Sequence, residues 1–136
     1  MQIITAAIIK GGTGKTTTAA ALSQAAVAAG KRVLAIDLDP QANLTFFIGA
    51  DQNRPGSYQL LHGTGASELI QSTSQGIAVI AASPDLATEK TTQASAKRLQ
   101  AAIEPIKRYF DFIFIDCSGK RIDLSFFFSN ALIRFS

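Results

Sequence analysis

Lys10-Gly11-Gly12-Thr13-Gly14-Lys15-Thr16 is a glycine-rich segment between an apolar run and an alanine-rich run. Its glycines let the backbone approach a ligand closely, with N–H groups pointing inward. A helix that begins near Lys15 adds the partial positive charge of its N-terminus, which favours anions. Lys15 provides a cation for β- and γ-phosphates, and Thr16 provides a hydroxyl for Mg²⁺. The segment predicts a cradle for a nucleotide triphosphate, because a turn with incidental lysines would not match at seven consecutive positions.

The runs on either side of this loop predict a β–α–β unit. Residues 3–9 are apolar and rich in β-branched side chains, as in a strand that is covered on both faces. Residues 15–29 are dominated by alanine, and Gly30 stands where a helix commonly ends. Residues 32–37 predict a second buried strand. We therefore expect two parallel strands joined by a right-handed crossover.

The rest of the chain continues the alternation of helices and strands. Further helices are expected over residues 41–48, 58–61 and 92–109, and further strands over residues 76–81 and 111–116. Pro105 lies inside the last of these helices and is expected to bend it. No linker or repeat divides the sequence. These features predict a single α/β domain over residues 1–136, with three layers around a mostly parallel sheet.

Composition and charge narrow the possible functions only slightly. Hydrophobic residues make up 47% of the 136 residues, which is enough for a core, and the net charge is +3. This mildly basic balance is compatible with a polyanionic partner without indicating one. A single cysteine, Cys117, and a single histidine, His62, exclude an internal disulfide and an iron–sulfur or zinc site. With no signal peptide and no membrane-spanning apolar run in this sequence, we expect a cytoplasmic protein.

Three acidic residues follow or end predicted strands. Asp37 and Asp39 stand at the end of the strand over residues 32–37, and Asp116 ends the strand over residues 111–116. Ligands of open α/β sheets bind at the carboxyl ends of the strands, and carboxylates there can serve Mg²⁺ and the attacking water. Each of the three residues could instead be a helix cap or a turn former.

The loop and the first acidic segment together resemble a known family. The usual phosphate-loop pattern would require glycine at Ile9, and this chain has an additional lysine at position 10 instead. That arrangement resembles the deviant Walker A box of the ParA/MinD class of P-loop ATPases. Residues 37–43 read Asp-Leu-Asp-Pro-Gln-Ala-Asn, which resembles the switch region of the ParA/Soj partition branch. We call residues 37–43 the switch segment. The resemblance implies a P-loop NTPase fold that is incomplete at its C-terminus.

The resemblance also implies a role for each site residue. Lys10 reaches across a nucleotide-sandwiched dimer to the partner's phosphates, and Lys15 stabilises the charge on the transferred group. Asp39 positions the hydrolytic water, so Lys10, Lys15 and Asp39 form the expected catalytic set. Asp116 matches the Walker B aspartate. The expected nucleotide-binding residues are Lys10, Gly11, Gly12, Thr13, Gly14, Lys15, Thr16 and Thr17, and the expected metal-site residues are Thr16, Asp37 and Asp116.

By the same resemblance, the expected function is a Mg-ATP-dependent ATPase in plasmid or chromosome partitioning. The expected cofactors are ATP or ADP and Mg²⁺. The expected partners are a second copy of the chain, a ParB-like centromere-binding protein and, in full-length relatives, nonspecific DNA of the nucleoid. No membrane partner is expected.

The resemblance covers residues 1 to about 117 and weakens beyond that point. Family members are longer, so this chain is expected to be truncated and its turnover of ATP is left open. The apolar residues 126–128 are expected to promote self-association, by exchange of the tail between two chains. Two alternatives remain. One is a noncatalytic regulator that forms heterodimers with a full-length ParA, and the other is a kinase-like or biosynthetic member of the class, which the switch segment disfavours.

Overall fold

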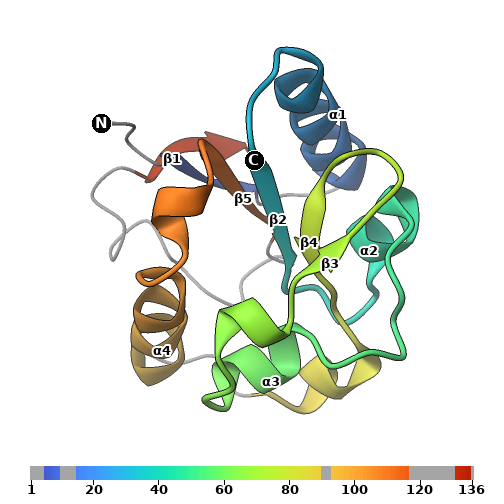
Figure 1. The fold of residues 1–136 in the computed structure, drawn as a ribbon. Helices are drawn as coiled ribbons and strands as arrows, with labels where there is room; N and C mark the ends of the chain where they lie inside the picture. The colour runs from blue at the N-terminus through green and yellow to red at the C-terminus, as the bar shows by residue number, and fades with distance from the viewer. Residues whose placement is uncertain (1–4, 10–14, 90–92, 117–130, 136) are drawn as a thin grey trace.

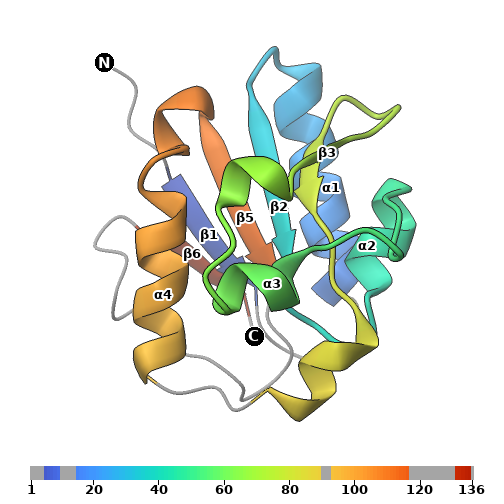
Figure 2. The same cartoon turned by 60° about the horizontal axis from the view of Figure 1, so that its bottom comes forward.

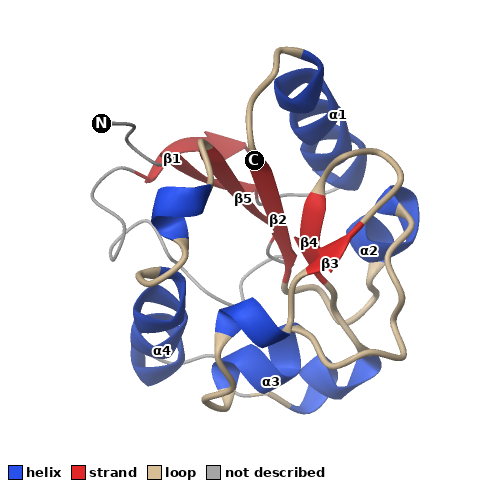
Figure 3. Ribbon diagram, in the orientation of Figure 1, coloured by secondary structure: helices blue, strands red, loops and turns tan. Residues whose placement is uncertain are grey.

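The protein is built around a twisted, mostly parallel sheet (Figure 1). The structure, a computed structural model, describes residues 5–9, 15–89, 93–116 and 131–135. Within these residues six strands lie in the order β3-β4-β2-β5-β1-β6. Only the β3–β4 pair is antiparallel. The strands, drawn in red in Figure 3, are β1 (Thr5–Ile9), β2 (Val33–Asp37), β3 (Gln71–Ser72), β4 (Ala78–Ile80), β5 (Phe112–Asp116) and β6 (Ala131–Phe135).

Helices cover both faces of the sheet, so the domain has the three layers that the sequence predicts. The α-helices of the described residues are α1 (Lys15–Ala28), α2 (Asn43–Ile48), α3 (Ser57–Leu61) and α4 (Gln93–Ile103), and the 3₁₀ turns are η1 (Ala66–Glu68), η2 (Pro84–Thr88) and η3 (Lys107–Tyr109). Figure 2 shows α3 and α4 in front of the strands. Residues from α1 and α2 belong to the hydrophobic cluster on the other face.

The central strand β2 divides its side chains between the two cores. Leu34 and Ile36 pack with the residues of α3 and α4, whereas Val33 and Ala35 pack with those of α1 and α2. This alternation follows from the two-residue period of a strand. All five residues of β2 are buried, which confirms the prediction of a strand that is covered on both faces.

The helix before β5 differs from the sequence prediction. The expected single helix over residues 92–109, bent at Pro105, is wrong, because α4 ends at Ile103 and a separate turn, η3, follows. Proline lacks the N–H that a helix needs and its ring collides with the preceding turn, so the helix stops before Pro105 instead of bending. Two further elements, β3 and β6, were not predicted.

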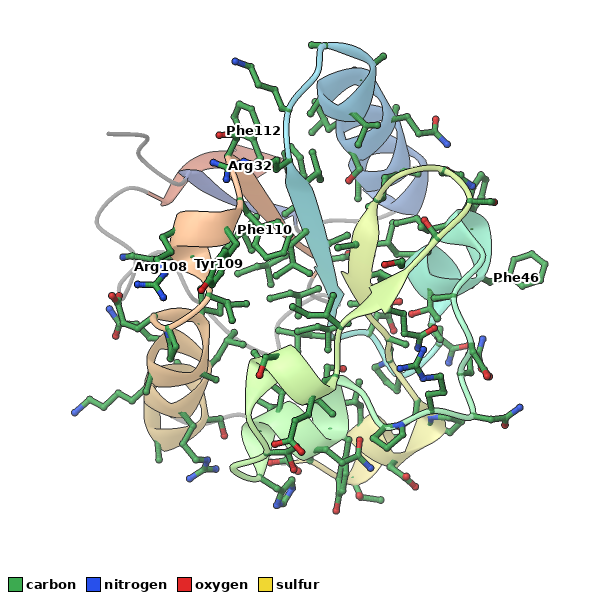
Figure 4. All side chains as sticks on the ribbon, viewed as in Figure 1. Arg32, Phe46, Arg108, Tyr109, Phe110 and Phe112 are labelled. Carbon is green, nitrogen blue, oxygen red and sulfur yellow. The ribbon has the colours of Figure 1, made fainter. Side chains whose placement is uncertain are left out.

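An ion pair joins β2 and β5 at their amino ends. The guanidinium of Arg32, labelled in Figure 4, donates to both carboxylate oxygens of Asp111, at 3.3 Å from Nε to Oδ2 and 3.1 Å from Nη2 to Oδ1. The backbone N–H of Arg32 also donates to Asp111, at 2.8 Å. These hydrogen bonds hold the pKa of the Asp111 carboxyl below its usual value. The pair helps to align the two strands whose opposite ends carry the candidate site.

Candidate functional site

Three parallel strands bring their carboxyl ends to the same level at one edge of the sheet. In the strand register, Ile9 of β1 lies opposite Asp116 of β5, and Asp116 lies opposite Asp37 of β2. The glycine-rich segment follows Ile9 directly, and α1 begins at Lys15. The sheet therefore gathers the entry to this segment and two of the predicted acidic residues at one edge, as expected for a ligand site of an open α/β sheet.

Part of the predicted site falls outside the described residues. Lys10, Gly11, Gly12, Thr13 and Gly14 lie there, as do Cys117 and residues 126–128. Lys15, Thr16 and Thr17 form the first turn of α1, so the predicted strand–loop–helix context is present on both sides of the segment.

Asp37 accepts three hydrogen bonds through its carboxylate. Its side chain is fully buried. One carboxylate oxygen, Oδ1, accepts the backbone N–H of Asp39 at 3.0 Å. The other, Oδ2, accepts the backbone N–H of Thr45 at 2.9 Å and the Thr45 hydroxyl at 2.7 Å. The pKa of Asp37 is raised from 3.8 to about 6, mainly by burial. The three hydrogen bonds lower the pKa and the nearby charge of Asp116 raises it, and both effects are included in this value.

Asp39 opens a tight turn that leads into α2. Its carboxylate Oδ1 accepts the backbone N–H of Gln41 at 3.0 Å, and its carbonyl oxygen accepts the N–H of Ala42 at 2.8 Å. Ala42 takes a left-handed conformation with φ 57°, which is uncommon for a residue other than glycine. Asp39 is buried, with 7% of its surface exposed, and the turn holds this predicted water-positioning residue at the strand edge.

Thr45 and Ser57 connect the carboxyl end of β2 to the residues that follow β4 through hydrogen bonds. The Thr45 hydroxyl accepts the N–H of Ala82, two residues beyond β4, at 2.9 Å. The Ser57 hydroxyl lies 2.6 Å from the carbonyl oxygen of Asp37 and 3.2 Å from that of Ala81. Both side chains are fully buried. Neither residue was singled out from the sequence, where the available signal was a threonine within the otherwise apolar run of α2.

Asp116 occupies the position between the β1 end and Asp37. Its side chain is 1% exposed, and its carbonyl oxygen accepts the N–H of Leu38 at 2.9 Å, which extends the β2–β5 ladder by one residue. Two carboxylates thus stand side by side at the strand ends. Their mutual repulsion favours a cation between or beside them.

The donor set fits Mg²⁺ held jointly with phosphate oxygens. Across the described residues, no group of three or more His, Cys, Asp or Glu side chains gathers to hold a metal. Mg²⁺ usually takes one or two protein carboxylates together with waters and substrate phosphates, and does not require an all-protein cage. Asp37 and Asp116 match that requirement in number and chemistry.

Comparison with known proteins identifies the family. A family model described as an AAA domain matches residues 1–134. The chain is 36% identical to the sporulation initiation inhibitor protein Soj of Bacillus subtilis, over 79% of this chain and 46% of Soj. It is 35% identical to the chromosome partitioning protein ParA of Caulobacter vibrioides, over 86% of this chain and 48% of ParA. The chain spans about half the length of these curated relatives.

A solved structure of a related protein has the same fold over most of this chain. Cobyrinic acid a,c-diamide synthase from Mycobacterium smegmatis, with a bound ATP analogue and magnesium, superposes with a TM-score of 0.78 at 31% identity, over 85% of this chain and 52% of the synthase. In the part of the chain that the structure describes, no helix is long and apolar enough to cross a membrane. The family match and these relatives together show that the chain belongs to the AAA-domain family, as a ParA-type P-loop ATPase.

Proposed function

We propose that this chain binds Mg-ATP at the carboxyl edge of its sheet and acts in DNA partitioning. The observation that carries the proposal is the strand register that aligns Ile9, Asp116 and Asp37. The lysine- and glycine-rich segment follows Ile9 in the sequence, and Asp116 and Asp37 are two buried carboxylates at the same level of the sheet as Ile9. A phosphate cradle and a magnesium site at one edge are what a nucleotide triphosphate requires.

The proposed division of labour follows the chemistry of each group. Residues 10–17 bind the phosphates through backbone N–H groups and the side chains of Lys10 and Lys15. Thr16, Asp37 and Asp116 belong to the metal site, where bound Mg²⁺ would neutralise charge on the β- and γ-phosphate oxygens. Thr17 extends the phosphate contacts into the first turn of α1.

The proposed reaction is hydrolysis of the terminal phosphate. Asp39 orients a water whose oxygen forms a bond to the γ-phosphorus while the bond to the β–γ bridging oxygen breaks. The products are ADP, inorganic phosphate and a proton. Lys10, supplied by a second copy of the chain, and Lys15 stabilise the charge that develops in the transition state. The turn that holds Asp39 at the end of β2 supports this assignment.

The partners belong to the same proposal. A nucleotide-sandwiched homodimer would bring Lys10 to the opposite site, and a tail-exchanged homodimer is the alternative arrangement. A ParB-like protein and nonspecific DNA are proposed partners of the whole protein, within the cytoplasm and at the nucleoid. The competing function is a nucleotide-binding regulator that forms heterodimers with a full-length ParA and does not turn over ATP.

Measurement of ATP binding and turnover by the purified chain tests the proposal. We expect Lys15→Ala to abolish nucleotide binding, and Asp39→Ala to preserve binding while lowering kcat by roughly a hundredfold or more. Binding that is lost in Lys15→Ala, together with turnover no faster than in that variant, would favour the regulator. Equal nucleotide binding by the wild-type chain and by Lys15→Ala would refute the nucleotide site itself. ATP-dependent retention on nonspecific DNA, assayed in parallel, would assign DNA binding to this part of the family sequence.

A further inference from the structure

We propose that Thr45 is a positioning residue for ATP hydrolysis, which locks the switch segment to the end of β4 through its side-chain hydroxyl. The inference rests on the proposed function, because it assigns to Thr45 the task of holding Asp39 where it can orient water. Thr45 touches neither the nucleotide nor the water in this scheme. It acts through Asp37, whose carboxylate reaches Asp39.

The hydroxyl of Thr45 both donates and accepts a hydrogen bond. It donates to Asp37 Oδ2 at 2.7 Å and accepts from the backbone N–H of Ala82 at 2.9 Å. An amide N–H can only donate, so the hydroxyl proton must point toward the carboxylate. Because Thr45 is fully buried, water is not available to replace either partner. The hydroxyl therefore fixes a direct connection from β4 to the Asp37 carboxylate.

The Asp37 carboxylate transmits this connection to both ends of the switch turn. Its Oδ2 holds the backbone of Thr45 at 2.9 Å, and its Oδ1 holds the backbone of Asp39 at 3.0 Å. Between them lies the turn that contains Ala42 in its left-handed conformation. Such a conformation is strained in a residue other than glycine and persists only where surrounding contacts support it. The clamp formed by Asp37 and Thr45 provides that support.

The backbone on the N-terminal side of Ala82 is held by hydrogen bonds. Ala82 follows β4, which pairs with β2 in parallel, and its neighbour Ala81 accepts the Ser57 N–H at 2.7 Å. Thr45 thus connects the switch segment to the residues that directly follow β4. The two hydrogen bonds of the Thr45 hydroxyl do not involve α1, where the proposed phosphate-binding turn lies. Loss of the hydroxyl should therefore reduce kcat more than it weakens nucleotide binding.

The test compares hydroxyl removal at Thr45 with the same change at a remote threonine. Thr45→Val keeps the shape of the side chain and removes both hydroxyl bonds, whereas Thr45→Ser keeps the hydroxyl. Thr73→Val is the matched control, because the Thr73 hydroxyl donates to the carbonyl oxygen of Ile77 at 2.7 Å, near the amino end of β4. We expect Thr45→Val to lower kcat by roughly tenfold to a hundredfold with KM for ATP changed by less than about threefold. Thr45→Ser and Thr73→Val should retain kcat within about threefold.

Amide hydrogen exchange provides a readout that is independent of turnover. Thr45→Val should accelerate exchange in peptides that cover residues 38–45 and Ala82, and Thr73→Val should not. If the wild-type chain does not hydrolyse ATP, the proposed function fails. If Thr45→Val leaves amide hydrogen exchange unchanged over residues 38–45 and at Ala82, the proposal that Thr45 anchors the switch segment fails, whatever the result for ATP turnover. If Thr45→Val does not fold, Thr45→Cys carries a weaker donor and must lower kcat more than Thr45→Ser. An active wild-type chain in which Thr45→Val keeps its kcat, or in which Thr45→Ser loses as much activity as Thr45→Val, overturns the inference.

Discussion

Replacing Gly56 with alanine should separate α3 from the end of β4. Gly56 is buried at the start of α3, and a Cβ atom built there would overlap the carbonyl oxygen of Ala81 and lie 2.9 Å from its carbonyl carbon. Both partners are backbone, so rotation of a side chain cannot relieve the overlap. The first turn of α3 must therefore move away from β4. This movement would break the hydrogen bond between the Ser57 hydroxyl and the carbonyl oxygen of Asp37.

The expected loss of stability follows from the bonds that depend on this close approach. The Ser57 N–H donates to Ala81 at 2.7 Å, and the Ser57 hydroxyl donates to the Asp37 carbonyl at 2.6 Å. Each hydrogen bond contributes about 1 kcal/mol, and a buried group left without its partner costs about 1–3 kcal/mol. We therefore expect Gly56→Ala to lower the free energy of unfolding by about 3 kcal/mol.

Gly65 offers a matched control for this substitution. It has φ −63° and ψ 138°, which alanine adopts readily, and a Cβ there would make only an ordinary contact, 3.5 Å from Glu68 Oε2. Gly65→Ala should therefore be neutral or stabilising by up to about 1 kcal/mol. Urea denaturation of the two variants and the wild-type chain measures the difference. If the free energies of unfolding of Gly56→Ala and Gly65→Ala agree within about 0.5 kcal/mol, α3 does not approach β4 as closely as the structure shows.

Two further predictions concern the charge of Asp37 and the surface of α2. Burial is the main cause that raises the pKa of Asp37 from 3.8 to about 6, so between these values the folded chain holds a proton that the unfolded chain releases. The free energy of unfolding of the nucleotide-free chain should fall by about 2 kcal/mol as pH rises from 4 to 7. Urea denaturation at pH 4 and pH 7 should measure this decrease in the free energy of unfolding. If Asp37→Asn shows the same decrease, another group causes it. On α2, Phe46 is 78% exposed and points away from the protein in Figure 4, whereas Ile48 is 1% exposed. Thermal unfolding should therefore show Phe46→Ser within about 0.5 kcal/mol of wild type and Ile48→Ala destabilised by about 2–5 kcal/mol, and equal losses would contradict the orientation of α2.

The parallel sheet could be predicted because its strands are continuous apolar runs. β2 and β5 are buried on both faces, and this environment requires the unbroken hydrophobic sequences that signal them. β3 escaped prediction because two residues carry no periodic pattern. The end of α4 escaped it because the apolar spacing continues through Ile106, although Pro105 stops the helix first.

The two carboxylates at the strand ends could be predicted for a similar reason. The residue that holds Asp37 in place, Thr45, could not. Asp37 and Asp116 each end an apolar run, so the sequence alone indicates that they lie at a strand end. Thr45 becomes important only when α2 folds back over β2 and presents its hydroxyl to both Asp37 and Ala82. The spacing of residues in one sequence carries no sign of such a contact, because it depends on where three separate elements end.

The hydrogen bonds of Asp37 give this carboxylate a structural task in the folded chain. Both oxygens of Asp37 accept hydrogen bonds from Asp39 and Thr45, so this carboxylate is committed to holding the switch segment. Asp116 lies between Asp37 and Ile9 in the strand register, on the side from which the glycine-rich segment departs. In the proposed metal site, Asp37 would therefore have a second task beside its place near Mg²⁺, because its carboxylate also holds the backbone of Asp39.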